Sequence, residues 1–492
     1  MTQVVKFIDT TLRDGQQSLW HLSMRTGMML PILPYMDEAG FDAVEFFVPV
    51  VQLKVLSRDL GEDPWQWLKL GSSLIKKTPL RHQAYRGQAF QEGLHIPKSA
   101  DLLLVKISLQ HGLTSLRSSS PWNRFDEIKD DVEDLKKLGM PFVVNLIYSV
   151  SPRHTDEYFI TRARDAAALK PYRMCLKDVG GLLKPGRIRE LLPRILAVIG
   201  DIPLEFHTHC TTGLGLLNVL EAVKHGVRYV HTGIPPLANG TAQPSIFAVA
   251  KNLRELGYEP DINLSALKPV EEHFTYIAKK ENLPIGEVLE YDERVYRHQI
   301  PGGMMSTLRF HLREFGMEHR LEEVLEETPK VRADFGYPIM VTPFSQFVAT
   351  QAAFNIIQGE RYKVVTDDTI QYALGHWGRE AVEVMDQDVR AKILDHPRAK
   401  ELAEKGMPQS QSDLPLEEVR KKVGEDLTDE ELLLKLWAGE QAVEIARRAP
   451  PPQPYLTSRQ PLIQLIDELA KIERNIHYIS IRKENFLLKL RT

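Results

Sequence analysis

Short runs of apolar and β-branched residues recur along the first half of the chain at a regular interval. The sequence predicts a strand in each of eight runs: 4–12, 41–47, 80–86, 102–109, 142–149, 173–178, 203–209 and 229–236. Their mean spacing is about 32 residues, the length of a unit that contains one strand and one helix. We therefore expect strands that alternate with helices.

Several intervals between these runs have the apolar spacing of amphipathic helices. Residues 126–139, 187–200 and 211–226 each end on glycine after an apolar stripe, as helix C-termini commonly do. Eight strand–helix units predict a (β/α)8 TIM barrel, which we assign to residues 1–290. In such a barrel the catalytic residues lie at the carboxyl ends of the strands.

The pattern becomes helical after the barrel. We expect a mostly helical second domain over residues 291–445, with helices in 318–336 and 346–359. A further helix is predicted over 427–437, where Thr428 and Glu431 have the spacing of a capping box.

The last part of the chain contains a linker and a small terminal segment. Residues 446–460 are rich in proline, which favours an extended and stiff linker. Residues 461–492 predict one amphipathic helix followed by two short strands. The apolar stripe of that helix consists of Leu462, Leu465, Ile466 and Leu469.

Composition narrows the class of protein. The 492 residues are 43% hydrophobic and 26% charged, with a formal net charge of −4, so nothing favours a nucleic-acid or anionic-membrane partner. No apolar run approaches the ~18 residues needed to span a bilayer, and the first residues lack the pattern of a signal peptide. With only two cysteines, no disulfide framework is indicated. We expect a cytoplasmic protein.

Polar side chains gather where the predicted strands end. They are Arg13 and Asp14, Arg86, Lys177, and His207 and His209. Strand alternation puts His207 and His209 on one face, and two imidazoles with the Asp14 carboxylate are a sound ligand set for a divalent metal. A His-x-His pair is also common as buried, hydrogen-bonded structure, and a lysine at a strand end is usually solvated. The coincidence of these groups favours the metal site.

Five motifs in order carry a resemblance to a known family. They are DTTLRDGQQS, LKDVGGLLKP, HTHCTTG, PGGMMSTL and VTPFSQFVATQAAFN. This series resembles the carboxyltransferase domain of biotin-dependent 2-oxo-acid carboxylases, whose members include pyruvate carboxylase, the oxaloacetate decarboxylase α subunit and the metal-bearing subunit of transcarboxylase. The resemblance covers about residues 4 to 375. It implies a barrel whose mouth is covered by the helical second domain.

The resemblance also implies a ligand set for a divalent metal, Zn, Mn or Co. The implied ligands are Asp14, His207, His209 and Lys177, the last as N6-carboxylysine, which supplies an anionic oxygen where a plain amine would be a poor ligand. A plain lysine stays open.

Further site residues follow from the same resemblance. Arg86 falls on the family's arginine for the substrate carboxylate, and Gln17 on its substrate-side glutamine. Thr342 matches the threonine that carries a proton between biotin and substrate. Arg13 either stabilises an enolate or braces Asp14.

The function implied is that of a carboxyltransferase subunit. It would move a carboxyl group between carboxybiotin and a small carbonyl substrate, a 2-oxo acid of the pyruvate/oxaloacetate type, through a metal-stabilised enolate. No Ala/Val-Met-Lys-Met biotinylation motif occurs in the chain, so we expect biotin on a separate carrier. Expected partners are a biotin carboxyl carrier protein, a biotin carboxylase subunit and a second copy of the chain.

The terminal segment has two interpretations. Residues 461–492 resemble the leading segment of a biotin carboxyl carrier protein, which predicts a docking segment for another subunit. A generic dimerising tail is the alternative.

The substrate pocket departs from the family at several positions. These are 21–23, 45–52, Gly93 with His95 nearby, and Phe344, so the substrate need not be pyruvate. Two other functions stay open: a biotin-independent, metal-dependent aldolase or lyase on the same barrel, and a non-catalytic scaffold of a carboxylase complex.

Overall fold

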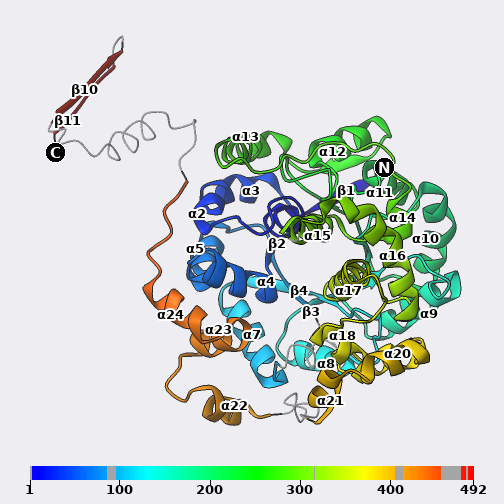
Figure 1. Cartoon of the computed structure of the whole chain (residues 1–492). Helices are drawn as coiled ribbons and strands as arrows, with labels where there is room; N and C mark the ends of the chain where they lie inside the picture. The colour runs from blue at the N-terminus through cyan, green and yellow to red at the C-terminus, as the bar shows by residue number, and fades with distance from the viewer. Residues whose placement is uncertain are drawn as a thin grey trace.

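Eight parallel strands close into a barrel in the computed structural model of the chain (Figure 1). The structure describes residues 3–85, 96–314, 316–404, 414–455, 478–483 and 486–491. The barrel strands are β1 (Val4–Asp9), β2 (Ala43–Phe47), β3 (Leu80–Tyr85), β4 (Leu113–Ser119), β5 (Phe142–Ile147), β6 (Arg173–Asp178), β7 (Leu204–Thr208) and β8 (Tyr229–Thr232). The predicted TIM barrel is confirmed.

Strand β1 closes the barrel by pairing on both sides. Its Ile8 is in register with Ala43 of β2 and with His231 of β8. A short strand, β9 (Glu259–Asp261), pairs with the beginning of β1. All these pairings are parallel, so the carboxyl ends of the eight barrel strands meet at one mouth.

Helices surround the strands as an outer layer (Figure 1). They are α2 (Thr26–Met29), α3 (Leu33–Ala39), α4 (Pro49–Lys54), α5 (Pro64–Leu74), α7 (Lys98–Gln110), α8 (Lys129–Lys137), α9 (Asp156–Ala168), α10 (Pro185–Ile199), α11 (Gly215–Lys224), α12 (Ile246–Glu255) and α13 (Leu264–Lys280). The short helix α1 (Gln16–Leu19) lies at the mouth instead. The helices predicted within 126–139, 187–200 and 211–226 are confirmed as α8, α10 and α11.

The fourth predicted strand is wrong. Residues 102–109 lie inside helix α7, and the fourth barrel strand is β4, Leu113–Ser119. The apolar residues of this run were interpreted as a buried strand. They are buried because Leu103, Leu104 and Ile107 lie at helical spacing, on the face of α7 that packs against the barrel. Strand β4 (sequence LTSLRSS) has few apolar residues because its inward side carries the buried charge of Arg117.

A second hydrophobic core lies over the barrel mouth. It is built by α15 (Gly302–Glu314), α16 (Leu321–Asp334), α17 (Phe344–Gln358), α18 (Asp367–Leu374), α19 (Arg379–Val384), α20 (Gln387–Leu394) and α21 (Pro397–Glu404). Helix α14 (Val295–His298) contacts α16 while its Val295 joins the barrel core, and the 3-10 turn η4 (Glu318–Arg320) contacts α15 and α16. Helix α15 packs on α1, the first helix after β1 and its following turn. The expected helical domain over the mouth is confirmed.

Side chains of the helical region bond to the loop that follows β5. The Gln299 amide donates to the Val150 carbonyl at 2.8 Å, and the Arg332 guanidinium donates to Ser149 Oγ at 2.8 Å. From the barrel side, Trp122 Nε1 donates to the Trp377 carbonyl at 2.9 Å. These contacts fix the helical region against the mouth.

Three later helices pack on the outside of the barrel instead. They are α22 (Leu416–Val423), α23 (Asp429–Ala438) and α24 (Glu440–Arg448), and their apolar residues join the barrel's own core beside α4 and α7. The predicted capping box is confirmed: Thr428 Oγ1 accepts from the Glu431 amide at 3.2 Å, and Glu431 accepts from the Thr428 amide at 3.0 Å. The predicted domain limits stay a prediction.

The proline-rich segment follows the barrel surface before the chain reaches its last strands. The Tyr455 amide donates to the Gly27 carbonyl at 2.8 Å, which holds this end of the segment to α2. The predicted strands are confirmed as an antiparallel pair, β10 (Tyr478–Lys483) and β11 (Phe486–Arg491). The amphipathic helix predicted before them lies outside the described residues.

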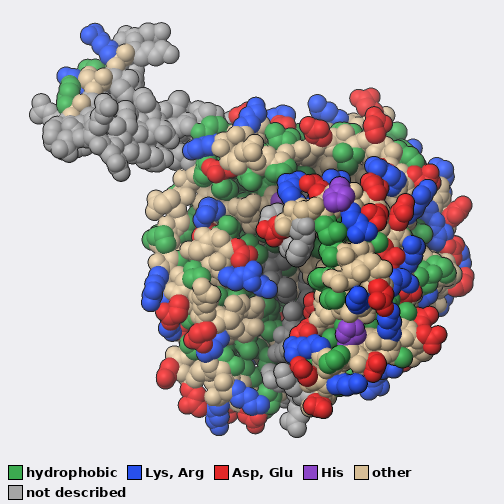
Figure 2. Space-filling model, viewed as in Figure 1, with side chains coloured by type: hydrophobic (Ala, Val, Ile, Leu, Met, Phe, Trp, Pro, Cys, Tyr) green, Lys and Arg blue, Asp and Glu red, His purple; other side chains and the backbone are tan. Residues whose placement is uncertain are grey.

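The surface is mixed in charge. Figure 2 shows acidic and basic side chains interspersed over one face, with a hollow between the α4 side and the α17 side of the molecule. Within the described residues, no helix is long and apolar enough to cross a membrane.

Trp122 should carry much of the contact between the barrel and the helical region. Its ring is 2% exposed and lies 4.9 Å from the ring of Phe344. We expect Trp122→Ala to lower the free energy of unfolding by about 3–5 kcal/mol, because the cavity cannot fill with other side chains. Trp122→Phe, which keeps a ring and loses one hydrogen bond, should cost about 1 kcal/mol. Calorimetric unfolding measures both, and an alanine variant with an unchanged transition would contradict the assignment.

Candidate metal centre and active site

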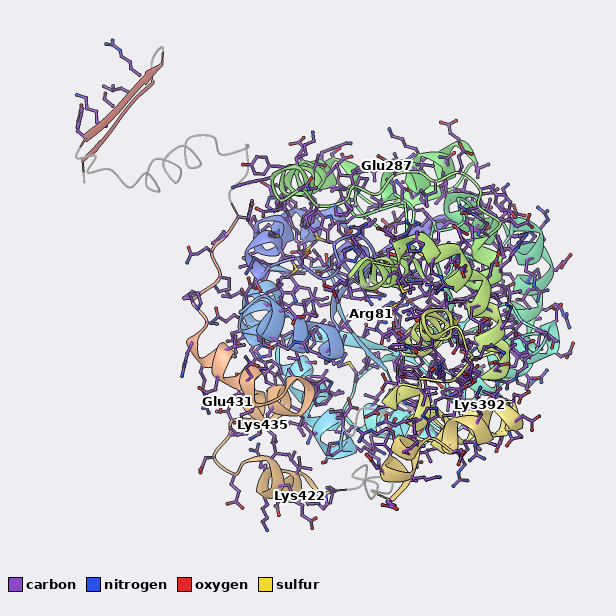
Figure 3. All side chains as sticks on the ribbon, viewed as in Figure 1. Arg81, Glu287, Lys392, Lys422, Glu431 and Lys435 are labelled. Carbon is purple, nitrogen blue, oxygen red and sulfur yellow. The ribbon has the colours of Figure 1, made fainter. Side chains whose placement is uncertain are left out.

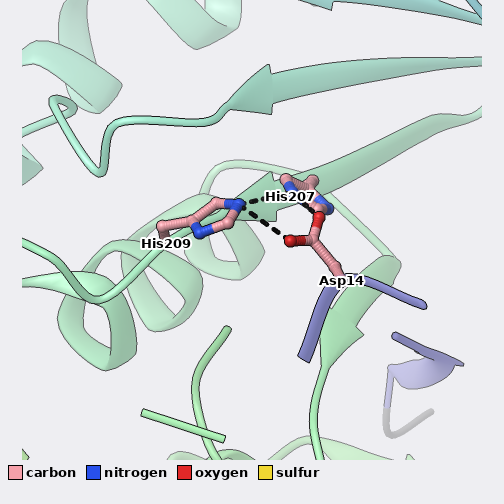
Figure 4. A group of neighbouring side chains, drawn as sticks. All are labelled: Asp14, His207 and His209. Atoms are coloured by element: carbon pink, nitrogen blue, oxygen red, sulfur yellow. Dashed lines mark hydrogen bonds and ion pairs between the residues drawn. The ribbon is translucent and has the colours of Figure 1, made fainter. Parts of the chain in front are cut away.

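Three ligand-type side chains converge at the barrel mouth: Asp14, His207 and His209 (Figure 4). Asp14 Oδ2 lies 3.3 Å from His207 Nε2, and Asp14 Oδ1 lies 3.5 Å from His209 Nε2. The two Nε2 atoms are 3.2 Å apart. Atoms that share one ion at bond lengths of about 2.0–2.2 Å lie about 2.8–3.6 Å from one another, so this spacing fits a single divalent cation.

Asp14 reaches this position through an unusual turn. The chain leaves β1 in a single π-helical turn, η1 (Thr11–Gly15), closed by a hydrogen bond from the Gly15 amide to the Thr10 carbonyl at 2.9 Å. A Cβ atom at Gly15 would lie 2.6 Å from the Leu237 carbonyl oxygen, so only glycine allows this close approach. Such π-helical turns occur frequently at functional sites.

The Asp14 carboxylate is charged although it is buried. An ion pair with Arg13 at 2.8 Å and a hydrogen bond from Ser18 Oγ at 3.1 Å stabilise the anion. Burial alone would raise the pKa of Asp14, but the charge of Arg13 acts against it, and this pKa lies well below its usual value. An anionic oxygen is therefore available as a ligand.

Both histidines turn a ring nitrogen, Nε2, toward Asp14. The ring of His209 faces the Thr241 carbonyl through Nδ1 at 2.6 Å, and a carbonyl only accepts, so Nδ1 carries the proton. The lone pair of His209 then lies on Nε2. His207 is fully buried, and burial lowers its pKa well below the usual value, so its ring is neutral.

Lys177 lies beside His207 on the neighbouring strand, since the two residues are in register between β6 and β7. Its side chain is buried, and the pKa of its amine is lowered to about 7 by burial first and then by the charges of Arg117 and Arg13. The Asp14 carboxylate opposes this shift. A substantial neutral fraction near pH 7 is the form that can react with CO2 to give the expected N6-carboxylysine.

A network of buried charges lies beneath these residues, deeper in the barrel. The Arg81 guanidinium binds both oxygens of Glu205 at 2.8 and 2.9 Å, and Figure 3 shows Arg81 in the middle of the barrel. Glu45 pairs with Arg117 and, at 2.6 Å, with Arg13. These groups are almost wholly excluded from solvent. Because buried charges are tolerated only when paired, the network fixes their positions.

Arg13 thus joins the network to the candidate metal site. Its Nε donates to Glu45 at 2.8 Å while another guanidinium nitrogen contacts Asp14. Of the two roles left open by the sequence, this geometry favours the brace for Asp14.

Two of the remaining predicted site residues, Gln17 and Thr342, are described in the structure. Gln17 is half-buried on α1, one turn after Asp14. Thr342 is half-buried just before α17, and its neighbour Val341 packs against Ile147 at the end of β5. Arg86 lies outside the described residues, as do Gly93 and His95. Cys175 and Cys210 are free, buried thiols.

The positions that depart from the family differ in their surroundings. His21 and Leu22 have positive φ angles of 47° and 64°, which non-glycine residues rarely adopt, in the turn after α1. Phe344 is fully buried in the core of the helical region. Residues 49–54 form α4.

Two residues at the site were not singled out in the sequence. The Gln243 amide faces both His207 Nε2 and His209 Nε2, at 3.2 and 2.9 Å, and follows no motif that the pattern of strands could reveal. Glu205 had a signal: it alternates with His207 and His209 along one face of the strand.

Comparison with known protein families divides the chain in the same order. A family model described as HMGL-like matches residues 4–273, and one described as a conserved carboxylase domain matches residues 295–452. The chain is 34% identical to a pyruvate carboxylase subunit of Methanocaldococcus jannaschii, over 80% of this chain and 69% of that one. The chain belongs to the carboxyltransferase family of the biotin-dependent carboxylases. The predicted family and the predicted enzyme class, a carboxyltransferase of a multi-subunit biotin-dependent carboxylase, are confirmed.

Other carboxyltransferase relatives differ in the reaction their names state. Identity is 33% with the 2-oxoglutarate carboxylase large subunit of Hydrogenobacter thermophilus, over 87% of this chain and 66% of that one. It is 30% with the methylmalonyl-CoA carboxyltransferase 5S subunit of Propionibacterium freudenreichii subsp. shermanii, over 76% and 74%. The carboxyl transferase domain of Rhizobium etli pyruvate carboxylase has the same fold, with a TM-score of 0.81, 21% identity, and coverage of 92% of this chain and 78% of that one.

Removal of Glu45 should destabilise the carboxyltransferase strongly. Glu45→Leu would leave Arg13 and Arg117 buried without their shared anion, which costs about 3–5 kcal/mol of the free energy of unfolding. The matched control is Glu221→Leu, because Glu221 pairs with Arg189 and Lys224, whose side chains are 57% and 47% exposed. That change should cost at most about 1 kcal/mol. Denaturant unfolding compares the two, and equal losses would argue against the network.

Proposed function

We propose that this carboxyltransferase moves a carboxyl group between carboxybiotin, held on a separate carrier protein, and a 2-oxo acid of the pyruvate/oxaloacetate type. The observation that carries the proposal is the cluster at the mouth. There an anionic Asp14 faces the Nε2 atoms of two imidazole rings, and a buried lysine of lowered pKa, Lys177, lies on the adjoining strand.

The donor set fits a divalent metal such as Zn, Mn or Co. Asp14, His207, His209 and the carbamylated Lys177 would hold it, since carboxylate and imidazole ligands suit these ions. When bound, the metal supplies Lewis-acid stabilisation for negative charge that develops on the substrate carbonyl oxygen. Carbamylation of Lys177 would replace a cationic amine with an anion next to Asp14 and the histidines.

Other residues of the chain bind the substrate and move the proton. The Arg86 guanidinium would hold the substrate carboxylate through two parallel hydrogen bonds, and the Gln17 amide would contact the substrate from α1. The Thr342 hydroxyl would take the proton from the substrate methyl carbon and deliver it to biotin. Arg13 would act through Asp14, as its contacts with Glu45 and Asp14 support.

The exact 2-oxo acid is a further part of the proposal. Relatives are named for pyruvate, 2-oxoglutarate and methylmalonyl-CoA, so the common chemistry is carboxylation beside a carbonyl group. The departure at 21–23 lies in the turn after α1, the helix that carries Gln17, and supports a pocket that differs from that of pyruvate carboxylase. Phe344 is buried in the core of the helical region.

A biotin-independent lyase or aldolase is the second candidate. The HMGL-like match to the barrel, residues 4–273, favours it. The match of residues 295–452 to a carboxylase domain argues against it, as does the helical region packed over the mouth. A non-catalytic scaffold would not require an anionic Asp14 beside two imidazole rings, so this cluster argues against a scaffold.

Biotin-dependent decarboxylation tests the proposal. Purified protein receives free biotin and a panel of 2-oxo acids and dicarboxylates, and release of CO2 is followed alongside metal content. We expect turnover of oxaloacetate or a close analogue that requires biotin. Asp14→Asn and His209→Ala should abolish both metal and turnover, because each removes a ligand.

Thr342→Ala separates proton transfer from metal binding in the same assay. It should keep the metal and lose about 10²–10⁴-fold in turnover, and Thr342→Ser should recover part of the loss. Turnover without biotin would favour the lyase, and turnover that survives in His209→Ala would overturn the site.

We also propose that the chain works with a biotin carboxyl carrier protein and a biotin carboxylase subunit, as a homodimer or larger oligomer. The terminal segment 461–492, which ends in the β10–β11 hairpin, would dock one of these subunits. A two-stranded sheet is rarely stable alone, which supports a partner for it.

Deletion of residues 456–492 tests this docking role. We expect the shortened chain to keep its fold, since Tyr455 is still bonded to Gly27, and to lose a biotinylated partner in co-purification. Size measurement in the same samples separates the alternatives: loss of the dimer with the partner retained would indicate a dimerising tail instead.

A further inference from the structure

The side of His207 that faces away from Asp14 is part of a buried hydrogen-bonded chain. His207 Nδ1 lies 3.1 Å from Nδ1 of His231, and Nε2 of His231 lies 3.0 Å from Oε2 of Glu205. All three side chains are fully buried, so no solvent water competes for these contacts. This series of hydrogen bonds therefore connects the charged network in the barrel to the candidate metal site.

The charge of Glu205 determines where each proton lies in this series of hydrogen bonds. Glu205 is an anion, because Arg81 holds both of its oxygens at 2.8 and 2.9 Å. A carboxylate only accepts hydrogen bonds, so the proton between Glu205 and His231 sits on His231 Nε2. The other carboxylate near this ring, Glu45, is paired with Arg117 and lies 3.6 Å from His231 Nδ1, too far to accept a hydrogen bond. No anion therefore holds a second proton on the ring, and the lone pair of His231 lies on Nδ1.

That lone pair determines the state of His207. The two Nδ1 atoms at 3.1 Å share one proton, and it must come from His207 because His231 Nδ1 is the acceptor. His207 then has no proton on Nε2, which is the nitrogen 3.3 Å from Asp14 Oδ2. The opposite arrangement would place an N–H group where the metal is expected.

We propose that His231 is a positioning residue: it accepts a hydrogen bond from His207 Nδ1 and so keeps the His207 Nε2 lone pair directed at Asp14 and His209. The inference rests on the metal site of the proposed function. His231 itself touches neither metal nor substrate. Its effect is on the affinity for metal, since partners of ligating histidines commonly contribute about 10–100-fold to that affinity.

A second metal site is the competing explanation for the same residues. Cys175, Glu205 and His231 present ligand atoms within 4.8 Å of one another. Both Glu205 oxygens are already bound by Arg81, and Arg173 lies 3.4 Å from one of them. The Cys175 sulfur accepts from Arg117 at 3.8 Å, and burial raises the pKa of this thiol to about 12. A cation would face repulsion from three guanidinium groups, so the histidine chain is the better account.

Two substitutions at one position separate hydrogen bonding from packing. His231→Leu fills the space but offers no acceptor, which leaves His207 Nδ1 without a partner or lets its proton move to Nε2. His231→Asn has an amide oxygen near the former Nδ1 position and can still accept from His207. The control is His273→Leu on α13. His273 is also buried, and it hydrogen-bonds to the Met28 carbonyl at 2.7 Å and to none of the site residues.

The measurement is the affinity of the full-length protein for Zn2+ in competition with a chelator, together with the visible spectrum of the Co2+-loaded protein. We expect His231→Leu to bind zinc about 10–100-fold more weakly and to change the cobalt spectrum. His231→Asn should stay within about threefold of the unsubstituted protein on the same reasoning, and His273→Leu should match it. Circular dichroism verifies that each variant is folded.

A folded His231→Leu variant with unchanged zinc affinity and cobalt spectrum would overturn the inference. Loss of one of two bound zinc ions per chain would also overturn it, in favour of the Cys175 site. If the leucine variant does not fold, nitrogen NMR of 15N-histidine-labelled, metal-free protein decides: a His207 proton on Nδ1 supports the inference and a proton on Nε2 overturns it. Failure of the proposed function looks different, because His209→Ala would then bind zinc like the unsubstituted protein.

Discussion

The pairing of buried charges inside the barrel is the constraint on which the site depends. The carboxylates of Glu45 and Glu205 lie deep in the interior, and guanidinium groups pair with each of them. An unpaired charge at this depth would cost several kcal/mol, so the geometry of the pairs is rigidly specified. The barrel interior therefore contains a network of buried ion pairs, which we call the ionic lattice. Many other barrels have layers of aliphatic side chains in this position.

Each of these two carboxylates is connected to a different group of the candidate metal site. Glu45 holds Arg13, and Arg13 holds Asp14 as an anion. Glu205 holds His231, which contacts His207. The same lattice lowers the pKa of Lys177, because the charges of Arg117 and Arg13 add to the effect of burial. One arrangement of charges thus sets the protonation states of the groups expected to meet the metal.

Sequence patterns predicted the parts of the molecule that repeat and the motifs that stand at strand ends. Strand alternation correctly brought His207 and His209 together, and position at the end of β1 brought Asp14 to them. The pattern failed at β4, where the inward side carries Arg117 in place of apolar residues and the helix α7 carries the apolar run. The ionic lattice was the reason for the error.

The supporting residues were harder to predict for a related physical reason. Glu205 and His231 are polar residues in strands, and their inward direction is visible in the alternation of a strand, but their partners come from other strands. Contacts between side chains on different strands depend on closure of the sheet into a barrel. A local sequence pattern does not predict this closure. Gln243 lies in a loop, where no periodicity exists to reveal its direction.

The depth of each residue also separates what is expected to be constant from what can vary among the relatives. Asp14 and His207 are tied through Arg13 and His231 to carboxylates at the centre of the barrel, so a change at either would disturb several buried charges at once. The turn at His21 and Leu22 is more exposed, and among the described contacts neither side chain bonds to these buried charges. Relatives whose names state different substrates can therefore share the deep lattice and differ at this turn, and the substrate of this carboxyltransferase is to be sought in the turn residues.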